Sequence, residues 1–383
     1  MSVTAASGFR AAGVAAGLKS TGLLDVALVV NDGPSRTGAG VFTANRVKAA
    51  PVVWTQQVVA DGRVEAVVLN SGGANACTGP AGFQDTHATA EWTADLLGVS
   101  AVDVAVCSTG LIGERLPVEA LLHAVDEAVP LLASTGADDA ARAIMTTDSR
   151  PKQSVAASDG FVVGGMAKGA GMLAPGLATM LAVVTTDAAV PADLLDRVLR
   201  AATARTFDRV DSDGCMSTND TVLLLASGAS RVAPDEEALG AAVEQVCADL
   251  AHQLVDDAEG ASKTVAVTVT RAATEPDALV VARAVARSNL LKCALHGEDP
   301  NWGRVLAAVG TTDAAFEPDR LAVALNDVWV CREGTAAEDR GKADLSAREV
   351  SVVVDLAAGG AEATVWTNDL TAAYVHENSA YST

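Results

Sequence analysis

Runs of β-branched and aliphatic residues alternate along the chain with segments in which apolar residues recur every three or four positions. The runs predict β-strands at 64–70, 102–107, 180–186, 221–226, 263–270, 321–331, 350–356 and 363–367. The recurring segments predict amphipathic helices within 83–98, 116–133, 190–207 and 234–260. Strands and helices mix without the strict alternation of a doubly wound fold, and the short spacing of the C-terminal strands favours antiparallel pairing. The pattern therefore predicts a layered α/β architecture with mixed sheets.

The composition indicates a large folded core. Half of the 383 residues are apolar and only 3% are aromatic, so alanine, valine and leucine must fill the interior. A chain of this length is expected to form two subdomains. The formal net charge of −21 repels phosphate backbones and anionic lipid surfaces, and the sequence has no run of about 18 apolar residues that could span a bilayer. We therefore expect neither a nucleic acid nor a membrane as a partner.

The cysteine and histidine positions do not predict a metal site. The six cysteines never approach the CxxC spacing of a zinc site, and a disulfide framework is not expected in a chain this long. The five histidines are scattered along the chain, and no two of them stand at helical spacing. The pattern is typical of reduced, mostly buried thiols, and so of a cytoplasmic protein without a bound metal.

Standard catalytic and nucleotide-binding motifs are mostly absent. The sequence has no GxSxG elbow and no HExxH, which disfavours a serine or zinc hydrolase. Two glycine-rich turns follow strand-like runs, LNSGGANACTG at 69–79 and CSTGLIGE at 107–114. Either turn could present backbone N–H groups to an anion, but neither contains a P-loop or GxGxxG pattern. Both turns also fit the simpler role of closing a strand.

One threonine stands where a flexible loop meets a strand-like run. In KGAGMLAPGLATMLAVVTTDA, residues 168–188, glycines and Pro175 lead to Thr179. An alcohol needs a base to become a nucleophile. Cutting the Ala178–Thr179 bond would free such a base, since a terminal α-amine has a pKa of about 7.7–8.0. The residues alone also fit the commoner case, a structural threonine at the start of a strand.

Together with many other blocks, this segment closely resembles the self-cleavage region of the ornithine acetyltransferase family, the glutamate N-acetyltransferases of cyclic arginine biosynthesis. The other blocks are GFRAAGVAAGLK at 8–19, GVFTANRVKAAPV at 40–52, NACTG at 75–79, STGLIGE at 108–114, AIMTTD at 143–148, STNDT at 217–221, EGASK at 259–263, GEDPNWGR at 297–304 and the tail NDLTAAYVHENSAYST. The resemblance implies a four-layer α/β/β/α fold that cleaves itself into chains 1–178 and 179–383. Two such pairs are expected to form a heterotetramer.

The resemblance also implies roles for single residues. The Thr179 hydroxyl would be the nucleophile, with its own amine as base, and Thr109 and Gly110 would form the oxyanion hole. The substrate-binding positions would be Thr146, Thr147, Lys168, Thr179, Glu259, Asn378 and Thr383. Lys168 would meet a carboxylate and Glu259 the side-chain ammonium of ornithine, while the choice between Thr146 and Thr147 stays open. The DPNWGR block would form part of the site wall, although Glu298, Asp299 and Arg304 fit structural ion pairs equally well.

The implied reaction transfers an acetyl group in two steps. Thr179 takes the acetyl group of N2-acetyl-L-ornithine and releases ornithine, after which L-glutamate takes the group and leaves as N-acetylglutamate. No cofactor is implied, and acetyl-CoA is left open as a second acetyl donor. Two alternatives remain: a paralogous acyltransferase of a specialised pathway, and a self-processed aminopeptidase on the same fold, which would resolve the threonine ester with water.

Overall fold

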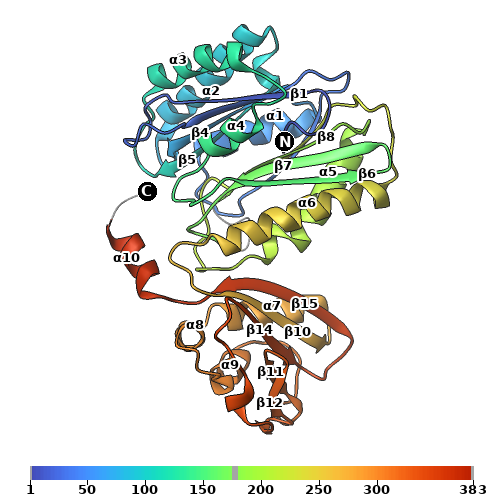
Figure 1. Cartoon of the computed structure of the whole chain (residues 1–383). Coiled ribbons are helices and arrows are strands. Elements are labelled where there is room, and N and C mark those ends of the chain that lie inside the picture. Colours follow the sequence, from blue (N-terminus) through green and yellow to red (C-terminus); the bar gives the residue numbers. More distant parts are fainter. Residues whose placement is uncertain (1, 175–179, 381–383) are drawn as a thin grey trace.

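The computed structural model describes residues 2–174 and 180–380. Within these residues, three mixed sheets of four, five and six strands organise the chain. The two smaller sheets and their helices form one body, and the third sheet forms a second body below it (Figure 1). No helix in the described part of the chain is both long and apolar enough to cross a bilayer.

The four-stranded sheet contains β1 (Phe9–Val14), β2 (Val26–Asn31), β4 (Ala66–Gly73) and β5 (Val104–Leu111). Its strands follow the order β1-β2-β4-β5, and the β4–β5 pair is parallel. The helices that pack against it are α1 (Ala50–Val58), α2 (Gly79–Leu97), α3 (Val118–Ala128) and α4 (Ala137–Ala143). The parallel pair matters for function, because it brings two glycine-rich strand ends to the same edge.

The five-stranded sheet contains β3 (Thr37–Phe42), β6 (Lys152–Ser158), β7 (Phe161–Lys168), β8 (Leu181–Thr186) and β9 (Thr221–Ala226), in the order β3-β9-β8-β7-β6. Side chains alternate along its strands, so that Val183 and Leu223 pack toward the first sheet. Val184 and Leu224 face the other way, against α5 (Ala192–Arg205) and α6 (Glu236–Asp256). The layers are therefore helix, sheet, sheet and helix, which confirms the predicted α/β/β/α arrangement.

The predicted division after residue 178 does not coincide with a boundary between the two bodies. β3, β6 and β7 precede that position and β8 and β9 follow it, yet all five strands belong to one sheet. The division itself lies outside the described residues and stays a prediction. Two fragments cut there would share a hydrogen-bonded sheet, because β7 pairs with β8 along its length.

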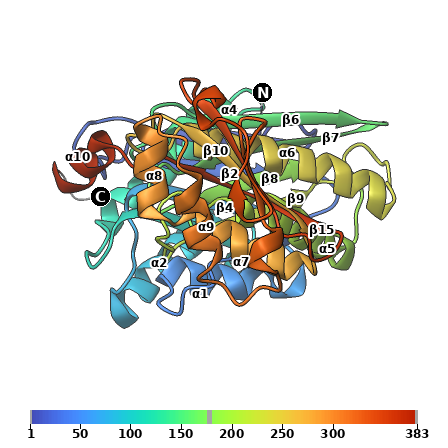
Figure 2. The same ribbon diagram turned by 90° about the horizontal axis from the view of Figure 1, so that it is seen from below.

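The second body has a mixed six-stranded sheet and its own apolar core. Its elements are β10 (Thr264–Ala272), α7 (Glu275–Ala286), α8 (Asn289–His296), α9 (Trp302–Val309), β11 (Ala322–Leu325), β12 (Val328–Arg332), β13 (Thr335–Ala336), β14 (Glu349–Asp355) and β15 (Ala361–Asn368). The last helix, α10 (Ala372–Ala380), stands apart from this sheet in both views (Figures 1 and 2). The chain after β15 therefore returns toward the first body.

One predicted strand is wrong. The run at 321–331 forms two antiparallel strands, β11 and β12, instead of one. The turn between them lies at Asn326 and Asp327, whose φ angles are 42° and 67°. Asparagine and aspartate tolerate this left-handed backbone, which a tight hairpin turn requires.

Candidate functional site

Residues from separate segments converge on a small cavity of about 120 Å³ between the two sheets and α10. The described members of the predicted site all line it: Thr109, Gly110, Thr146, Thr147, Lys168, Glu259 and Asn378. Ala178, Thr179 and Thr383 lie outside the described residues, and the predictions for them stay predictions. The site is thus assembled by the fold from positions up to 269 residues apart, from Thr109 to Asn378.

Thr109 and Gly110 lie at the end of β5, where the parallel partner strand supplies Ser71 and Gly72. Gly110 has a φ of 127°, and a Cβ atom there would lie 2.5 Å from the backbone nitrogen of Gly73. No other residue fits, because both the backbone angle and the space exclude a side chain. The end of β4 therefore packs so closely against the turn that only glycine fits at position 110.

Lys168 ends β7 and is buried, with 2% of its surface exposed. Its Nζ donates a hydrogen bond of 3.1 Å to Thr109 Oγ1. Burial lowers the pKa of Lys168, and the nearby Lys152 lowers it further, while Asp148 opposes both. An ammonium group in this position faces the turn at Gly110 and can meet an anionic group of a ligand.

Asp148, which the sequence analysis did not single out, anchors this cation. Its carboxylate accepts hydrogen bonds from Lys152 Nζ at 2.6 Å, the Gly169 amide at 2.7 Å and the Thr146 amide at 2.9 Å. Burial alone would raise the pKa of Asp148, but Lys168, Lys152 and the Gly169 amide bring it below its ordinary value. Asp148 therefore contributes negative charge beside two buried lysines, together with Asp257 at Lys152, and fixes the loop that carries Thr146.

Glu259 lies just after α6, with its carboxylate in the cavity wall. Its two oxygens accept hydrogen bonds from Thr147 Oγ1 at 2.6 Å and Asn378 Nδ2 at 3.0 Å. A Cβ atom at Gly171 would lie 2.6 Å from the same carboxylate, so a side chain there would displace it. The acid is thus held from three sides and suits a ligand ammonium group. Thr146 and Thr147 both line the cavity, and only the Thr147 hydroxyl has a described bond to Glu259.

Two neighbours in the STNDT block also belong to the site, although no role was predicted for them. Asn219 donates to the carbonyls of Ala74 at 2.6 Å and Ser108 at 2.8 Å, and so ties the two strand ends together. Asp220 is fully buried and accepts from the amide of Met180 at 3.1 Å. Burial raises the pKa of Asp220 well above its ordinary value. The block appeared in the resemblance, but its residue types alone indicate only a polar turn.

The DPNWGR block lies elsewhere, contrary to expectation. None of its residues is among those that line the cavity. Its aspartate and arginine make contacts within the second body, where Arg340 lies 4.0 Å from Asp299 and Arg304 bonds the Leu290 carbonyl. The block therefore stabilises the second body, since its tryptophan begins α9 there.

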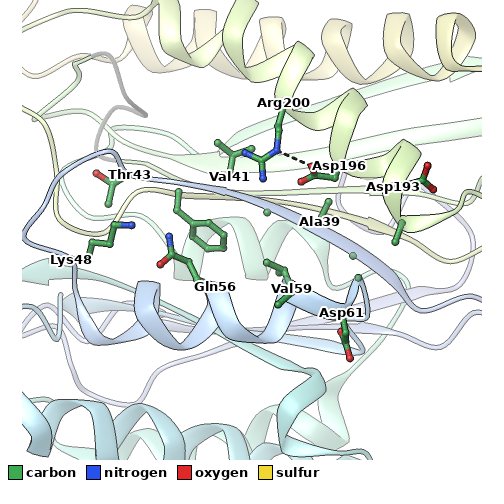
Figure 3. Close-up of a pocket in the computed structure, with 16 residues that line it drawn as sticks. Ala39, Val41, Thr43, Lys48, Gln56, Val59, Asp61, Asp193, Asp196 and Arg200 are labelled. Carbon is green, nitrogen blue, oxygen red and sulfur yellow. Dashed lines mark hydrogen bonds and ion pairs between the residues drawn. The ribbon is translucent and has the colours of Figure 1, made fainter.

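A larger cavity of about 620 Å³ lies between β3, α1 and α5, away from these residues (Figure 3). Its charged side chains include Asp61, Asp193 and Asp196, and Arg200 pairs with Asp196 at 2.8 Å. None of the predicted site residues that the structure describes lines it. Size alone therefore does not mark the functional site in this chain.

Comparison with known proteins identifies the family of the chain. The sequence profile of the ArgJ family matches residues 10–383. Curated relatives named arginine biosynthesis bifunctional protein ArgJ are 67% identical in Streptomyces coelicolor, over all of both chains, and 62% identical in Thermobifida fusca, again over all of both. The Mycobacterium tuberculosis relative of the same name is 59% identical over 99% of this chain and 96% of its own.

Solved structures are also similar in sequence. A chain of Mycobacterium tuberculosis ornithine acetyltransferase complexed with ornithine is 57% identical, covers 47% of this chain and 96% of its own, and has a TM-score of 0.43. A chain of the ArgJ protein from Bacillus halodurans is 33% identical, covers 51% and 97%, and has a TM-score of 0.49. The family profile and the full-length relatives together show that the chain belongs to the ArgJ family.

Proposed function

We propose that this chain is a glutamate N-acetyltransferase of arginine biosynthesis, which moves the acetyl group of N2-acetyl-L-ornithine to L-glutamate. The observation that carries the proposal is the convergence of Thr109, Gly110, Lys168 and Glu259 on one cavity. It pairs an ammonium and a carboxylate beside a glycine turn, which is the set of groups that an N-acylated diamino acid requires. Family membership supports the same reaction.

The chemistry proceeds through an ester on Thr179. Its Oγ attacks the acetyl carbonyl while its α-amine takes the hydroxyl proton, and the tetrahedral oxyanion is stabilised by Thr109 and Gly110. The C–N bond then breaks, and the proton goes to the departing ornithine amine. In the second step the amine of glutamate attacks the ester carbonyl, the Thr179 oxygen leaves with a proton, and N-acetylglutamate is released. Cleavage of the Ala178–Thr179 bond has to come first, because an amide nitrogen is not basic.

Incubation of the purified protein with N-acetylornithine and glutamate tests this proposal. We expect ornithine and N-acetylglutamate to appear in equal amounts, with little free acetate. Accumulation of acetate instead of N-acetylglutamate would favour the self-processed aminopeptidase. Activity with other acyl amino acids and none with N-acetylornithine would favour the paralogue of a specialised pathway.

Three further features of the proposal await their own tests. Acetyl-CoA can acetylate the same threonine, and the release of the free CoA thiol in the presence of glutamate measures this second activity. The two fragments stay paired and form a heterotetramer, which sizing of the native protein measures. The enzyme works in the cytoplasm; all six cysteines are free thiols, as a reducing compartment favours.

Replacing Gly110 by alanine is expected to lower kcat by about 100-fold or more, the usual cost of losing one oxyanion donor. The added methyl group would collide with the backbone at Gly73 and push the turn away from the cavity. Steady-state kinetics checks the result. Gly113 is the matched control: it also has a positive φ, of 90°, but a Cβ there meets nothing within 4 Å. Similar losses in both variants would show that backbone strain alone explains the effect.

Replacing Glu259 by glutamine is expected to raise KM for N-acetylornithine about tenfold or more with kcat nearly unchanged, because hydrogen bonds to charged groups contribute about 1.5–3 kcal/mol. The amide keeps the shape of the side chain but cannot neutralise an ammonium group. Initial-rate kinetics over a range of N-acetylornithine concentrations measures the change. Glu237→Gln, at the exposed start of the same helix, is the control. If KM were unchanged in the Glu259 variant, the ammonium group of the substrate would not bind at this position.

A further inference from the structure

The two substrates of the proposed function make opposite demands on one site. N-acetylornithine carries one carboxylate and a side-chain ammonium, whereas glutamate carries two carboxylates. Of the described residues that line the small cavity, only Lys168 and Glu259 have charged side chains. This pair suits the ornithine skeleton, but it leaves the second carboxylate of glutamate beside Glu259, where like charges repel. A second cation within reach of the cavity would resolve the conflict.

A neighbouring cavity of about 740 Å³ opens from the same place. It shares Gly110, Thr146 and Thr147 with the small cavity, and its wall includes the loop at 18–24. Two basic residues line it, Lys19 and Arg142. Arg142 has 56% of its side chain exposed and is already paired with Asp138 at 2.7 Å. Lys19 is half-buried and lacks such an exposed ion pair, so it is the better placed cation.

The loop that carries Lys19 is fixed in position by a buried acid. The carboxylate of Asp25 accepts hydrogen bonds from the amides of Ala16 at 2.6 Å, Leu18 at 2.7 Å and Lys19 at 3.1 Å. The loop also touches the oxyanion turn, because a Cβ at Gly72 would lie 2.8 Å from the Leu18 carbonyl oxygen. Gly72 in turn pairs with Gly110. The loop is therefore packed directly against the turn that carries Gly110.

The Lys19 ammonium group has donors to spare among the residues that the structure describes. Its Nζ donates one hydrogen bond to them, of 2.8 Å, to the Leu24 carbonyl, and an ammonium has three donors. Burial lowers the pKa of Lys19; the carboxylates of Asp25 and Asp148 raise it, and the charge of Lys168 lowers it again. Asp148 and Lys168 belong to the site described above. The ammonium group therefore interacts with the acetyl-transfer site across the shared opening.

We propose that Lys19 binds the side-chain carboxylate of the glutamate acceptor and so distinguishes it from ornithine. This assignment rests on the proposed acetyl transfer. Glutamate binds with its amine at the acetyl ester, one carboxylate at Lys168 and the other in the neighbouring cavity at Lys19. N-acetylornithine binds with its side chain toward Glu259 and does not use Lys19. The two substrates thus share one binding position but extend to different sides of it. The ornithine ammonium group lies toward Glu259, and the second carboxylate of glutamate lies toward Lys19.

A Lys19→Met variant tests the proposal, with two acceptors compared on one enzyme. Loss of a charged hydrogen bond is expected to lower kcat/KM for glutamate about tenfold or more. Exchange of isotopically labelled ornithine into N-acetylornithine uses an acceptor without that carboxylate, and we expect it to stay within about twofold of the native rate. Arg142→Met, in the same cavity, should leave the rates with glutamate and with ornithine unchanged. Lys19→Arg should keep part of the activity with glutamate that Lys19→Met loses.

The proposal is overturned if Lys19→Met lowers the rates with glutamate and with ornithine equally, since that would indicate a structural role. It is also overturned if the substitution lowers neither rate. The exchange reaction also reports whether the variant is folded. Failure of the proposed function itself would look different: the native protein would form no N-acetylglutamate from N-acetylornithine and glutamate.

Discussion

Replacing Thr179 by alanine is expected to give a single uncut polypeptide without acetyltransferase activity. The variant loses the hydroxyl that would attack the preceding carbonyl, and so it also never gains the free α-amine that would act as base. Removal of a nucleophile typically lowers kcat by about 10⁴-fold or more. Gel electrophoresis and the rate of ornithine release measure the two effects on the same sample.

Thr179→Ser is the matched control, because serine keeps both the hydroxyl and the amine. We expect this variant to cut itself and to transfer acetyl groups, though more slowly. Thr179 lies outside the described residues. Met180, the residue before β8, is buried, and its amide donates a hydrogen bond to Asp220. If the alanine variant still split at the same bond, an external protease would explain the cut and self-cleavage would be wrong.

Replacing Asp148 by asparagine is expected to lower the free energy of unfolding by about 3–5 kcal/mol, the usual cost of removing one partner from a buried ion pair. Lys168 would lose the largest of its opposing charges, and Lys152 would keep its 2.5 Å contact with Asp257. Urea titration against the native protein measures the loss. Asp138→Asn removes an exposed partner of Arg142 and should leave stability nearly unchanged. If the two variants were equally stable, the negative charge of Asp148 would not stabilise the buried cluster.

The same substitution should also remove part of the acid sensitivity of the fold. The folded pKa of Asp148 lies below its ordinary value, so the unfolded chain takes up the proton more readily. The stabilisation is therefore fully present above about pH 4, the unfolded value, and is lost as the pH falls through the lower folded pKa. The asparagine variant should lack this part of the pH profile.

The sequence predicts those elements whose own residues determine them. The amphipathic pattern at 190–207 became α5, and the acid-rich start at 234–260 became α6, where Asp235 caps the helix. The runs at 221–226 and 350–356 became β9 and β14. In each case strong local preference and the burial of one face point to the same structure.

Three of the missed strands have weak local preferences, whereas β2, with the sequence VALVVN, has a strong β-branched pattern and was missed all the same. β1, β3 and β7 have the sequences FRAAGV, TGAGVF and FVVGGMAK, in which glycine and alanine replace the usual β-branched residues. Their small side chains reflect close packing: a Cβ at Gly164 would lie 1.9 Å from the carbonyl oxygen of Ser2. Contacts between distant segments determine these strands, and a local pattern cannot reveal them.

The site divides in a similar way. Lys168, Glu259 and Asn378 were identified through a resemblance between blocks, because nothing in their local sequence brings them together. Asp148 and Asn219 were missed, since buried hydrogen bonds to loops and strand ends define them. A polar residue inside a turn looks the same in sequence whether it faces solvent or organises a site.

Catalysis by a self-released Thr179 can be decided by intact-mass analysis of the native protein after mixing with N-acetylornithine. We predict two polypeptides, 1–178 and 179–383, with the mass of one acetyl group added to the second and lost again when glutamate is supplied. A fully active protein that remains one continuous chain, or an acetyl group on any residue other than Thr179, would contradict it.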